Sequence, residues 1–330
     1  MLNLAELDIP IAGVLDEQLE EVAVILERQL ASDLSPVNGL CRHVEQYRGK
    51  RLRPILVLLS GLATCKVRDG SGLTERHRVL AAVVEMIHMA TLVHDDVLDE
   101  AQIRRGVVTL NYLRGNESAV MLGDYLISNA FHLCSRLMDP QINLCLGNVT
   151  NTLCEGELLQ LHHRDDLDID EATYREIVAR KTASLIGECC RLGALVSDAQ
   201  PTVLDSMYRF GTKLGIAFQI QDDLLDITGD EAVVGKSLHR DLGSGKVTLP
   251  LIRYLASADA REATEVRRLF AEGRVEKLRL RLIESGAVQD ARREAEQLIE
   301  QAKTLLGAVR GDAARELLAT LADAVISRRF

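Results

Sequence analysis

The fold is decided by residues 78–100, which read RVLAAVVEMIHMATLVHDDVLDE. Apolar side chains occupy nearly every position before Thr91, so no face of a helix here suits solvent, and the stretch predicts a central, buried helix. Its last turns instead carry Asp95, Asp96 and Asp99. Crowded carboxylates repel one another and lose hydration near a core, so positive groups are expected beside them.

The rest of the chain repeats the helical signal. Hydrophobic residues make up 47% of the 330 residues, aromatic residues only 3%, and there are 6 prolines, a composition typical of aliphatic helix packing. Apolar stretches with helical spacing recur at 53–67, 118–138, 142–161, 173–196 and 208–228, without convincing strand alternation. The sequence therefore predicts an all-α, single-domain bundle of ten or more helices over residues 1–330, with outer amphipathic helices at 256–330.

Charge and composition exclude several classes of protein. The net charge of −10 argues against general nucleic-acid binding, which requires a basic surface. No stretch of about 18 apolar residues is present, so we expect no spanning membrane segment. No secretory signal is visible, and the 7 cysteines include no CxxC pair, so we expect a cytoplasmic protein with free thiols.

The DDxxD pattern of residues 95–99 returns at residues 222–226, 127 positions later and again at the end of an apolar run. Because each helical residue turns about 100°, the first and last aspartates of each copy share a face, and the middle one points aside. A single DDxxD is often only a solvated helix end, but two such copies indicate paired carboxylates at one site. Oxygen-only ligands suit Mg²⁺, which is usually shared with phosphates, and no histidines with zinc spacing accompany them.

Basic residues can supply the compensating charge. They come from GKRLRP at 49–54, from RRG at 104–106, and from Lys181, Lys236 and Lys246. Any one of them could be a simple surface group, but the set suits a diphosphate–Mg²⁺ site, where metals bridge carboxylates to phosphate oxygens and cations neutralise the remaining charge. GDEAVVGKS at 229–237 is not a P-loop, since 5 residues separate its glycines where four are required.

These stretches resemble the trans-isoprenyl diphosphate synthase family, also called polyprenyl synthetases, most closely its bacterial long-chain members such as octaprenyl diphosphate synthases. The resemblance is carried by GKRLRP, EMIHMATLVHDDVLDEAQIRRG, EGELLQL, KTASL, FQIQDDLLDITGD and GKSLHRDLGSGKVTLPL, which follow the family's order over about residues 40–255. It implies the isoprenoid synthase fold, with helices around a central cavity, and a homodimer. It also implies Mg²⁺-dependent, head-to-tail condensation of isopentenyl diphosphate with an allylic diphosphate to give an all-trans polyprenyl diphosphate.

The resemblance further assigns roles to individual residues. It implies metal binding by Asp95, Asp99 and Asp222, with Asp226 close by; allylic diphosphate binding by Arg104, Lys181 and Lys236; isopentenyl diphosphate binding by Lys50, Arg53, His88 and Arg105; cation stabilisation by Thr182 and Gln219; and a closing loop at Asp241 and Lys246. His88 lies two helical turns before Asp95 and so faces the same cavity. Without the resemblance, a packed core histidine would be the preferred interpretation.

Product length is expected to depend on the helical turn before Asp95. Short-chain family members place a bulky aromatic residue there, whereas this chain has Ala90 beside Met89 and Thr91. An open tunnel and a product longer than C20 are therefore expected, with a geranylgeranyl or farnesyl diphosphate synthase as the alternative. Phe131 is either part of the tunnel floor or ordinary core.

Two other functions share parts of this pattern. A terpene cyclase has the same fold and the first acidic motif, but its second motif normally carries Asn or Asp, then Ser or Thr, then Glu. Here those positions are Asp222, Asp226 and Asp230, and GKRLRP and RRG suit a second diphosphate that a cyclase does not bind. A non-catalytic partner subunit usually loses one acidic motif, and this chain has both.

Overall fold

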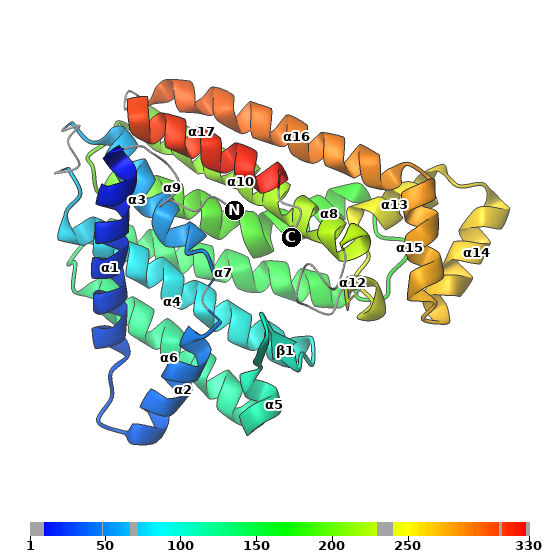
Figure 1. Cartoon of the computed structure of the whole chain (residues 1–330), viewed down its shortest axis with the longest axis horizontal. Helices are drawn as coiled ribbons and strands as arrows, with labels where there is room; N and C mark the ends of the chain where they lie inside the picture. Colours follow the sequence, from blue (N-terminus) through cyan, green and yellow to red (C-terminus); the bar gives the residue numbers. More distant parts are fainter. Residues whose placement is uncertain (1–9, 48, 67–71, 230–239, 310–311, 328–330) are drawn as a thin grey trace.

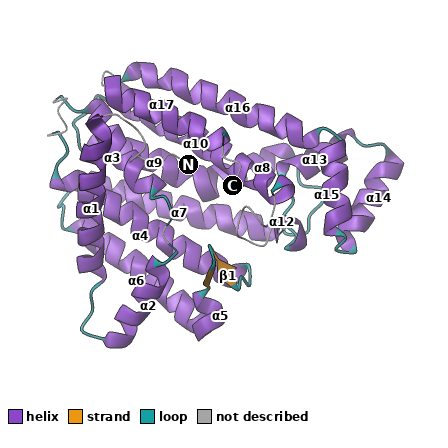
Figure 2. Ribbon diagram, in the orientation of Figure 1, coloured by secondary structure: helices purple, strands orange, loops and turns teal. Residues whose placement is uncertain are grey.

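The computed structural model describes residues 10–47, 49–66, 72–229, 240–309 and 312–327, and this part of the chain is almost entirely helical (Figure 2). Its α-helices are α1 (Pro10–Leu30), α2 (Ser35–Glu45), α3 (Leu52–Thr64), α4 (Glu75–Leu98), α5 (Leu110–Arg114), α6 (Asn116–Ser135), α7 (Pro140–His162), α8 (Glu171–Val178), α9 (Ser184–Leu195), α10 (Pro201–Thr228), α12 (Arg240–Gly243), α13 (Leu249–Ser257), α14 (Ala260–Ala271), α15 (Val275–Glu284), α16 (Ala287–Leu305) and α17 (Asp312–Ile326). The predicted all-α bundle of ten or more helices is confirmed.

The helix predicted to be central, α4, is buried, and so is the apolar helix α3. In α3, all residues from Pro54 to Ala63 are buried, and in α4 the buried positions run around the whole helix from Val79 to Ile87. α4 packs along α3 and α6, while α9 packs along α3 and α10 (Figure 1). Aliphatic residues on every face of α3 and α4 thus fix these helices inside the bundle.

The C-terminal helices cover one side of this core. α16 and α17 run side by side along α10, and α14 and α15 lie at one end of the bundle (Figure 1). In α16 the buried residues fall on one stripe: Ala287, Val288, Ala291, Ala295, Ile299 and Ala302. The expected amphipathic pattern of this helix is therefore confirmed, since the other positions are mostly charged and outward-facing.

A small β-hairpin follows α4 and was not predicted. Strand β1 (Ile103–Arg104) pairs antiparallel with β2 (Val107–Val108). The turn residues Arg105 and Gly106 both have positive φ, as a type I′ turn requires. Two-residue strands are too short to show alternation in the sequence, which explains the difference. The hairpin brings the RRG segment back beside the end of α4.

None of the helices in the described ranges is long and apolar enough to cross a membrane.

Candidate active site

The first acidic motif lies at the C-terminal end of α4. Asp95 and Asp99 are half-buried, and the side chain of each lies near a lysine. Lys181 Nζ is 3.6 Å from Asp95 Oδ1, and Lys246 Nζ donates a hydrogen bond of 2.9 Å to Asp99 Oδ2. Asp96 is instead buried, at 1% exposure, and accepts a 2.8 Å hydrogen bond from Arg104 Nε. The middle aspartate therefore points aside, as helical geometry predicts.

The second acidic motif ends α10 and reaches the same lysine. Asp226 Oδ2 accepts a 3.2 Å hydrogen bond from the backbone N–H of Asp241. Asp241 Oδ1 in turn lies 3.7 Å from Lys246 Nζ, which already binds Asp99. Lys246 thus connects the ends of α4 and α10, so the structure brings both acidic motifs to one place. Burial acts to lower the pKa of Lys246, but Asp241 and Asp99 outweigh it and raise that pKa, which keeps the ammonium charged.

Two charged residues beside the first motif were not predicted. Glu157, on α7, forms an ion pair with Lys181, and burial raises the pKa of this carboxyl despite the lysine. Arg164, just after α7, has Nη2 3.8 Å from Asp99 Oδ1. Glu157 lies in the EGELLQL segment, which contributed to the family resemblance, but no role was assigned to this residue. The sequence around Arg164 is polar and gives no sign of a contact with the first acidic motif.

The expected isopentenyl diphosphate residues lie partly together. Burial lowers the pKa of Arg53, and the carboxylates of Glu85 and Asp222 partly oppose that effect. Burial and the positive charge of Arg53 lower the pKa of His88 well below its usual range, so the imidazole is neutral at pH 7. Arg105 donates to the backbone carbonyl of Tyr47. The charge of Arg53 therefore acts on His88, and the charge of Asp222 in the second acidic motif acts on Arg53.

Lys181 and Thr182 lie on a π-helical segment, Ala179–Ala183, between α8 and α9. Single π turns often occur at functional sites, because they rotate side chains away from the regular α-helical positions. Thr182 Oγ1 donates a 2.9 Å hydrogen bond to Gln219 Oε1 on α10. Gly156 of α7 lies directly against the backbone of this segment, where any Cβ would be 2.5 Å from the Lys181 nitrogen.

The remaining predicted residues are distributed as follows. Lys236, like Asp230, lies outside the described residues, and Lys50 is exposed just before α3. Met89 and Ala90 are buried on α4, and Thr91 Oγ1 donates to its own helix at His88 O. Phe131 on α6 is partly buried against the hydrophobic core.

The two acidic motifs supply carboxylate oxygens of the kind that bind Mg²⁺. Within the described ranges, no group of three or more His, Cys, Asp or Glu side chains is arranged as a complete metal site. Asp99 Oδ1 is nevertheless buried without a hydrogen bond, as are Glu157 Oε1, Arg53 Nε and His88 Nδ1. Buried carboxylate oxygens without a partner fit Mg²⁺, and buried side-chain nitrogens without a partner fit phosphate oxygens. Mg²⁺ is usually bound by a few carboxylates together with a phosphate ligand, and rarely by protein ligands alone.

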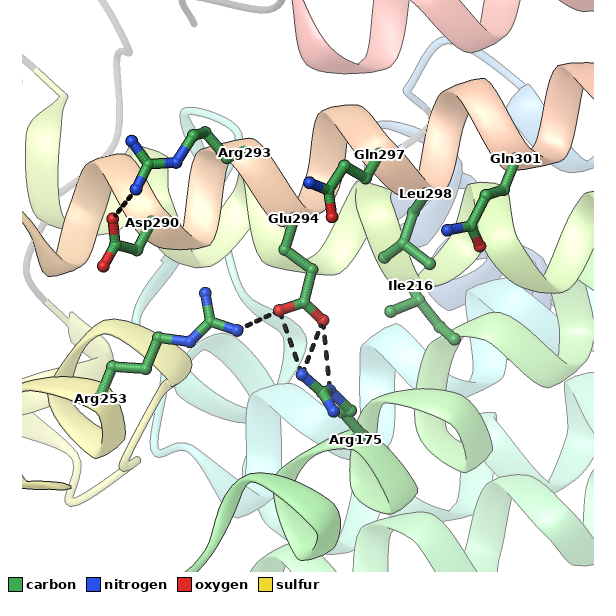
Figure 3. Close-up of a pocket in the computed structure, with 9 residues that line it drawn as sticks. All are labelled: Arg175, Ile216, Arg253, Asp290, Arg293, Glu294, Gln297, Leu298 and Gln301. Atoms are coloured by element: carbon green, nitrogen blue, oxygen red, sulfur yellow. Dashed lines mark hydrogen bonds and ion pairs between the residues drawn. The ribbon is translucent and has the colours of Figure 1, made fainter.

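A separate surface hollow of about 500 Å³ lies between α8, α10, α13 and α16 (Figure 3). Two arginines, Arg175 and Arg253, converge there on Glu294. Neither acidic motif contributes to its lining, so this hollow is distinct from the site at the ends of α4 and α10.

Comparison with known proteins identifies the arrangement. The profile of the Polyprenyl synthetase family matches residues 35–282. The chain belongs to the polyprenyl synthetase family. This polyprenyl synthetase is therefore a prenyltransferase of the prenyl diphosphate synthase class, whose members use a divalent metal.

Three relatives cover nearly the whole polyprenyl synthetase chain. A "Prenyl transferase" of Synechocystis is 37% identical over 95% of this chain and 96% of its own. The "Octaprenyl diphosphate synthase" of Escherichia coli is 33% identical over 93% of this chain and 94% of its own. A polyprenyl synthase from Caulobacter crescentus, crystallised with calcium and isoprenyl diphosphate, superposes with a TM-score of 0.89 at 31% identity, over 97% and 98% of the two chains. The isoprenoid synthase fold expected from the sequence is confirmed.

Proposed function

We propose that this protein condenses isopentenyl diphosphate head-to-tail with an allylic diphosphate and releases an all-trans polyprenyl diphosphate longer than C20. The observation that carries the proposal is the connection of both acidic motifs through one lysine, from Asp99 through Lys246 and Asp241 to Asp226. Carboxylates on both sides and cations between them form a cradle for a diphosphate with its metal ions.

Asp95, Asp99 and Asp222, with Asp226 nearby, would hold Mg²⁺, which supplies charge neutralisation for the departing diphosphate. Lys181, which pairs with Asp95, and Arg104, held by Asp96, would bind the allylic diphosphate from the protein side. Arg53, His88 and Arg105, with Lys50 at the entrance, would bind isopentenyl diphosphate. Lys246 and Asp241 would close over both substrates.

The reaction then follows from the charges. The allylic carbon–oxygen bond breaks, and its electron pair leaves with the diphosphate, which the surrounding cations stabilise. The terminal alkene carbon of isopentenyl diphosphate forms the new carbon–carbon bond to the allylic carbon. The tertiary cation that results loses a proton from C2 of the isopentenyl unit to the released diphosphate, which forms the new allylic double bond. Thr182 and Gln219 present oxygen lone pairs to the positive carbon, and aliphatic walls exclude water from it.

A long product is favoured by the residues beside the first motif. Ala90 is fully buried on α4 and leaves more room than an aromatic residue would. Met89 and Thr91 flank it, and Phe131 lies on α6, against which α4 packs. We propose that the growing tail passes between these helices, with Phe131 near its end.

We further propose a cytoplasmic homodimer. Met121 on α6 and Leu144 and Leu158 on α7 are 65–66% exposed, which is unusual for large apolar side chains on neighbouring helices. A second copy of the chain would cover them. The 7 unpaired cysteines suit a reducing compartment.

Product analysis tests the proposal. The purified chain with Mg²⁺ and isopentenyl diphosphate is incubated separately with geranyl, farnesyl and geranylgeranyl diphosphates, and the products are measured by mass spectrometry. Linear products extended in five-carbon steps beyond C20 are expected. Cyclised hydrocarbons would indicate a terpene cyclase, and no elongation by the chain alone would indicate a subunit that needs a catalytic partner.

A further inference from the structure

The middle aspartate of the second acidic motif takes part in a chain of hydrogen bonds that the proposed reaction does not use. Tyr174 OH, on α8, donates a 2.6 Å hydrogen bond to Asp223 Oδ2. Gln219 Nε2 donates a 2.8 Å hydrogen bond to Asp223 Oδ1. Gln219 Oε1 then accepts the 2.9 Å hydrogen bond from Thr182 Oγ1. The chain therefore runs from a tyrosine at the outer helix to the threonine beside Lys181.

These groups are positioned for each other and not for solvent. Tyr174 and Asp223 are both 4% exposed, and both carboxylate oxygens of Asp223 already accept a hydrogen bond. Burial raises the pKa of Asp223, and the hydrogen bonds donated by Tyr174 and Gln219 oppose this effect by stabilising the ionised carboxylate, the form in which both oxygens accept. Asp223 thus faces inward, as Asp96 does in the first motif, and its oxygens are already used in hydrogen bonds, unlike those of a metal ligand as proposed for Asp222.

The chain fixes which end of the Gln219 amide faces Thr182. A glutamine amide has a donor end and an acceptor end, and its side chain can be rotated by 180° with little change in shape. Asp223 requires the donor end, because its oxygens accept. The acceptor end, Oε1, must then face Thr182, whose hydroxyl proton is used in that hydrogen bond. The lone pairs of Thr182 Oγ1 remain for other partners.

A network of ion pairs holds α8 in the place this chain requires. Arg175, next to Tyr174, contacts Glu171 on α8 and Glu294 on α16. Arg253 on α13 contacts the same two glutamates, and Figure 3 shows the contacts of both arginines with Glu294. The network ties α8 to α13 and α16. It therefore fixes the position of α8, from which Tyr174 reaches Asp223 on α10.

We propose that Tyr174 and Asp223 are positioning residues, which orient the Gln219 amide so that Thr182 presents oxygen lone pairs, and not its hydroxyl proton, to the allylic carbon as positive charge develops. This inference rests on the proposed function. If the amide turned over, the Thr182 proton would point toward that charge and oppose ionisation. Electrostatic groups fixed in advance in this way contribute strongly to transition-state stabilisation.

The first test compares Tyr174→Phe and Asp223→Asn with wild type in steady-state kinetics. We expect kcat to fall about 10- to 100-fold while KM for both diphosphates changes less than about 3-fold, because the lost interaction acts only in the transition state. Tyr125→Phe is the matched control: its hydroxyl lies 3.5 Å from Leu30 O, outside the site, and its removal should leave kcat unchanged. An unchanged kcat in Tyr174→Phe would overturn the proposal. So would a fall in kcat accompanied by a change in KM of similar size and by a lower melting temperature, because that pattern indicates a general structural loss.

A double-mutant cycle separates positioning from a structural role. Thr182→Val removes the hydroxyl that the chain orients, so Tyr174→Phe should cost less than about 2-fold further in kcat in that background. Independent, multiplying losses would contradict a chain that acts through Thr182.

The hydrogen-bond chain can also be tested without catalysis. The side-chain amide signals of Gln219, measured by NMR in the free protein, should shift in Tyr174→Phe and Asp223→Asn but not in Tyr125→Phe. If wild type forms no elongated product and these shifts appear, the proposed reaction fails while the geometry holds. If wild type elongates and the shifts are absent, the positioning role fails alone.

Discussion

Replacement of Gly156 by alanine should disturb the active site through the contact between α7 and the π-helical segment Ala179–Ala183. The new Cβ would lie 2.5 Å from the backbone nitrogen of Lys181 and 2.7 Å from Arg180 Cβ, so the π-helical segment must move. Overpacking of this kind costs about 1–3 kcal/mol. The same segment carries Thr182, and a displacement of about 1 Å at a catalytic site can lower the rate about 100-fold.

Gly147 is the matched control, because it lies on the same helix and a Cβ there meets nothing within 4 Å. Gly147→Ala should stabilise the protein by about 0.5–1 kcal/mol through helix propensity alone, with unchanged activity. Urea unfolding and steady-state kinetics of both variants measure the difference. We expect Gly156→Ala to be the less stable variant by about 1–3 kcal/mol and to lose about 10- to 100-fold in kcat/KM. If the two variants were equally stable and equally active, the contact between α7 and the π-helical segment would not be what holds Lys181 in place.

Three further outcomes are expected. Lys246→Met should lower kcat/KM about 10-fold or more, because it removes the charge between the two acidic motifs. The control Lys303→Met removes a lysine on α16 that also pairs with two carboxylates, and it should leave kcat/KM unchanged. Equal effects of the two substitutions would contradict the role of Lys246. Burial lowers the pKa of His77 to about 4, so below pH 6.5 this residue binds more protons in the unfolded chain than in the folded one, which contributes a fall of about 2 kcal/mol in the free energy of unfolding between pH 7 and pH 5. In urea titrations His77→Gln should lose about 2 kcal/mol less than wild type over this range, and the loss that remains comes from His88, whose pKa is also lowered. Ala90→Tyr should shorten the product measured by mass spectrometry, and an unchanged length distribution would remove Ala90 from the tunnel.

The sequence predicted the parts of the molecule that depend on local pattern. Aliphatic residues on all faces of α4 required burial, and the 100° turn per residue placed Asp95 and Asp99 on one face with Asp96 aside. Both predictions concern one helix at a time, where periodicity is informative.

The parts that were missed depend on contacts between distant segments. Tyr174 and Asp223 are 49 residues apart, and nothing in either segment indicates the other. Arg164 lies in an ordinary polar loop, and its approach to Asp99 follows only from how α7 packs. The hairpin was missed for a local reason, since two residues per strand show no alternation.

The central claim is that both acidic motifs hold one diphosphate through shared metal ions, and a crystal structure with Mg²⁺ and inorganic diphosphate tests it most directly. We expect Mg²⁺ about 2.0–2.1 Å from carboxylate oxygens of Asp95 or Asp99 and of Asp222, with diphosphate oxygens completing the coordination. Lys246 should then have left Asp99 for the diphosphate. Diphosphate bound away from residues 95–99 and 222–226, or metal ions held by one motif alone, would contradict the account.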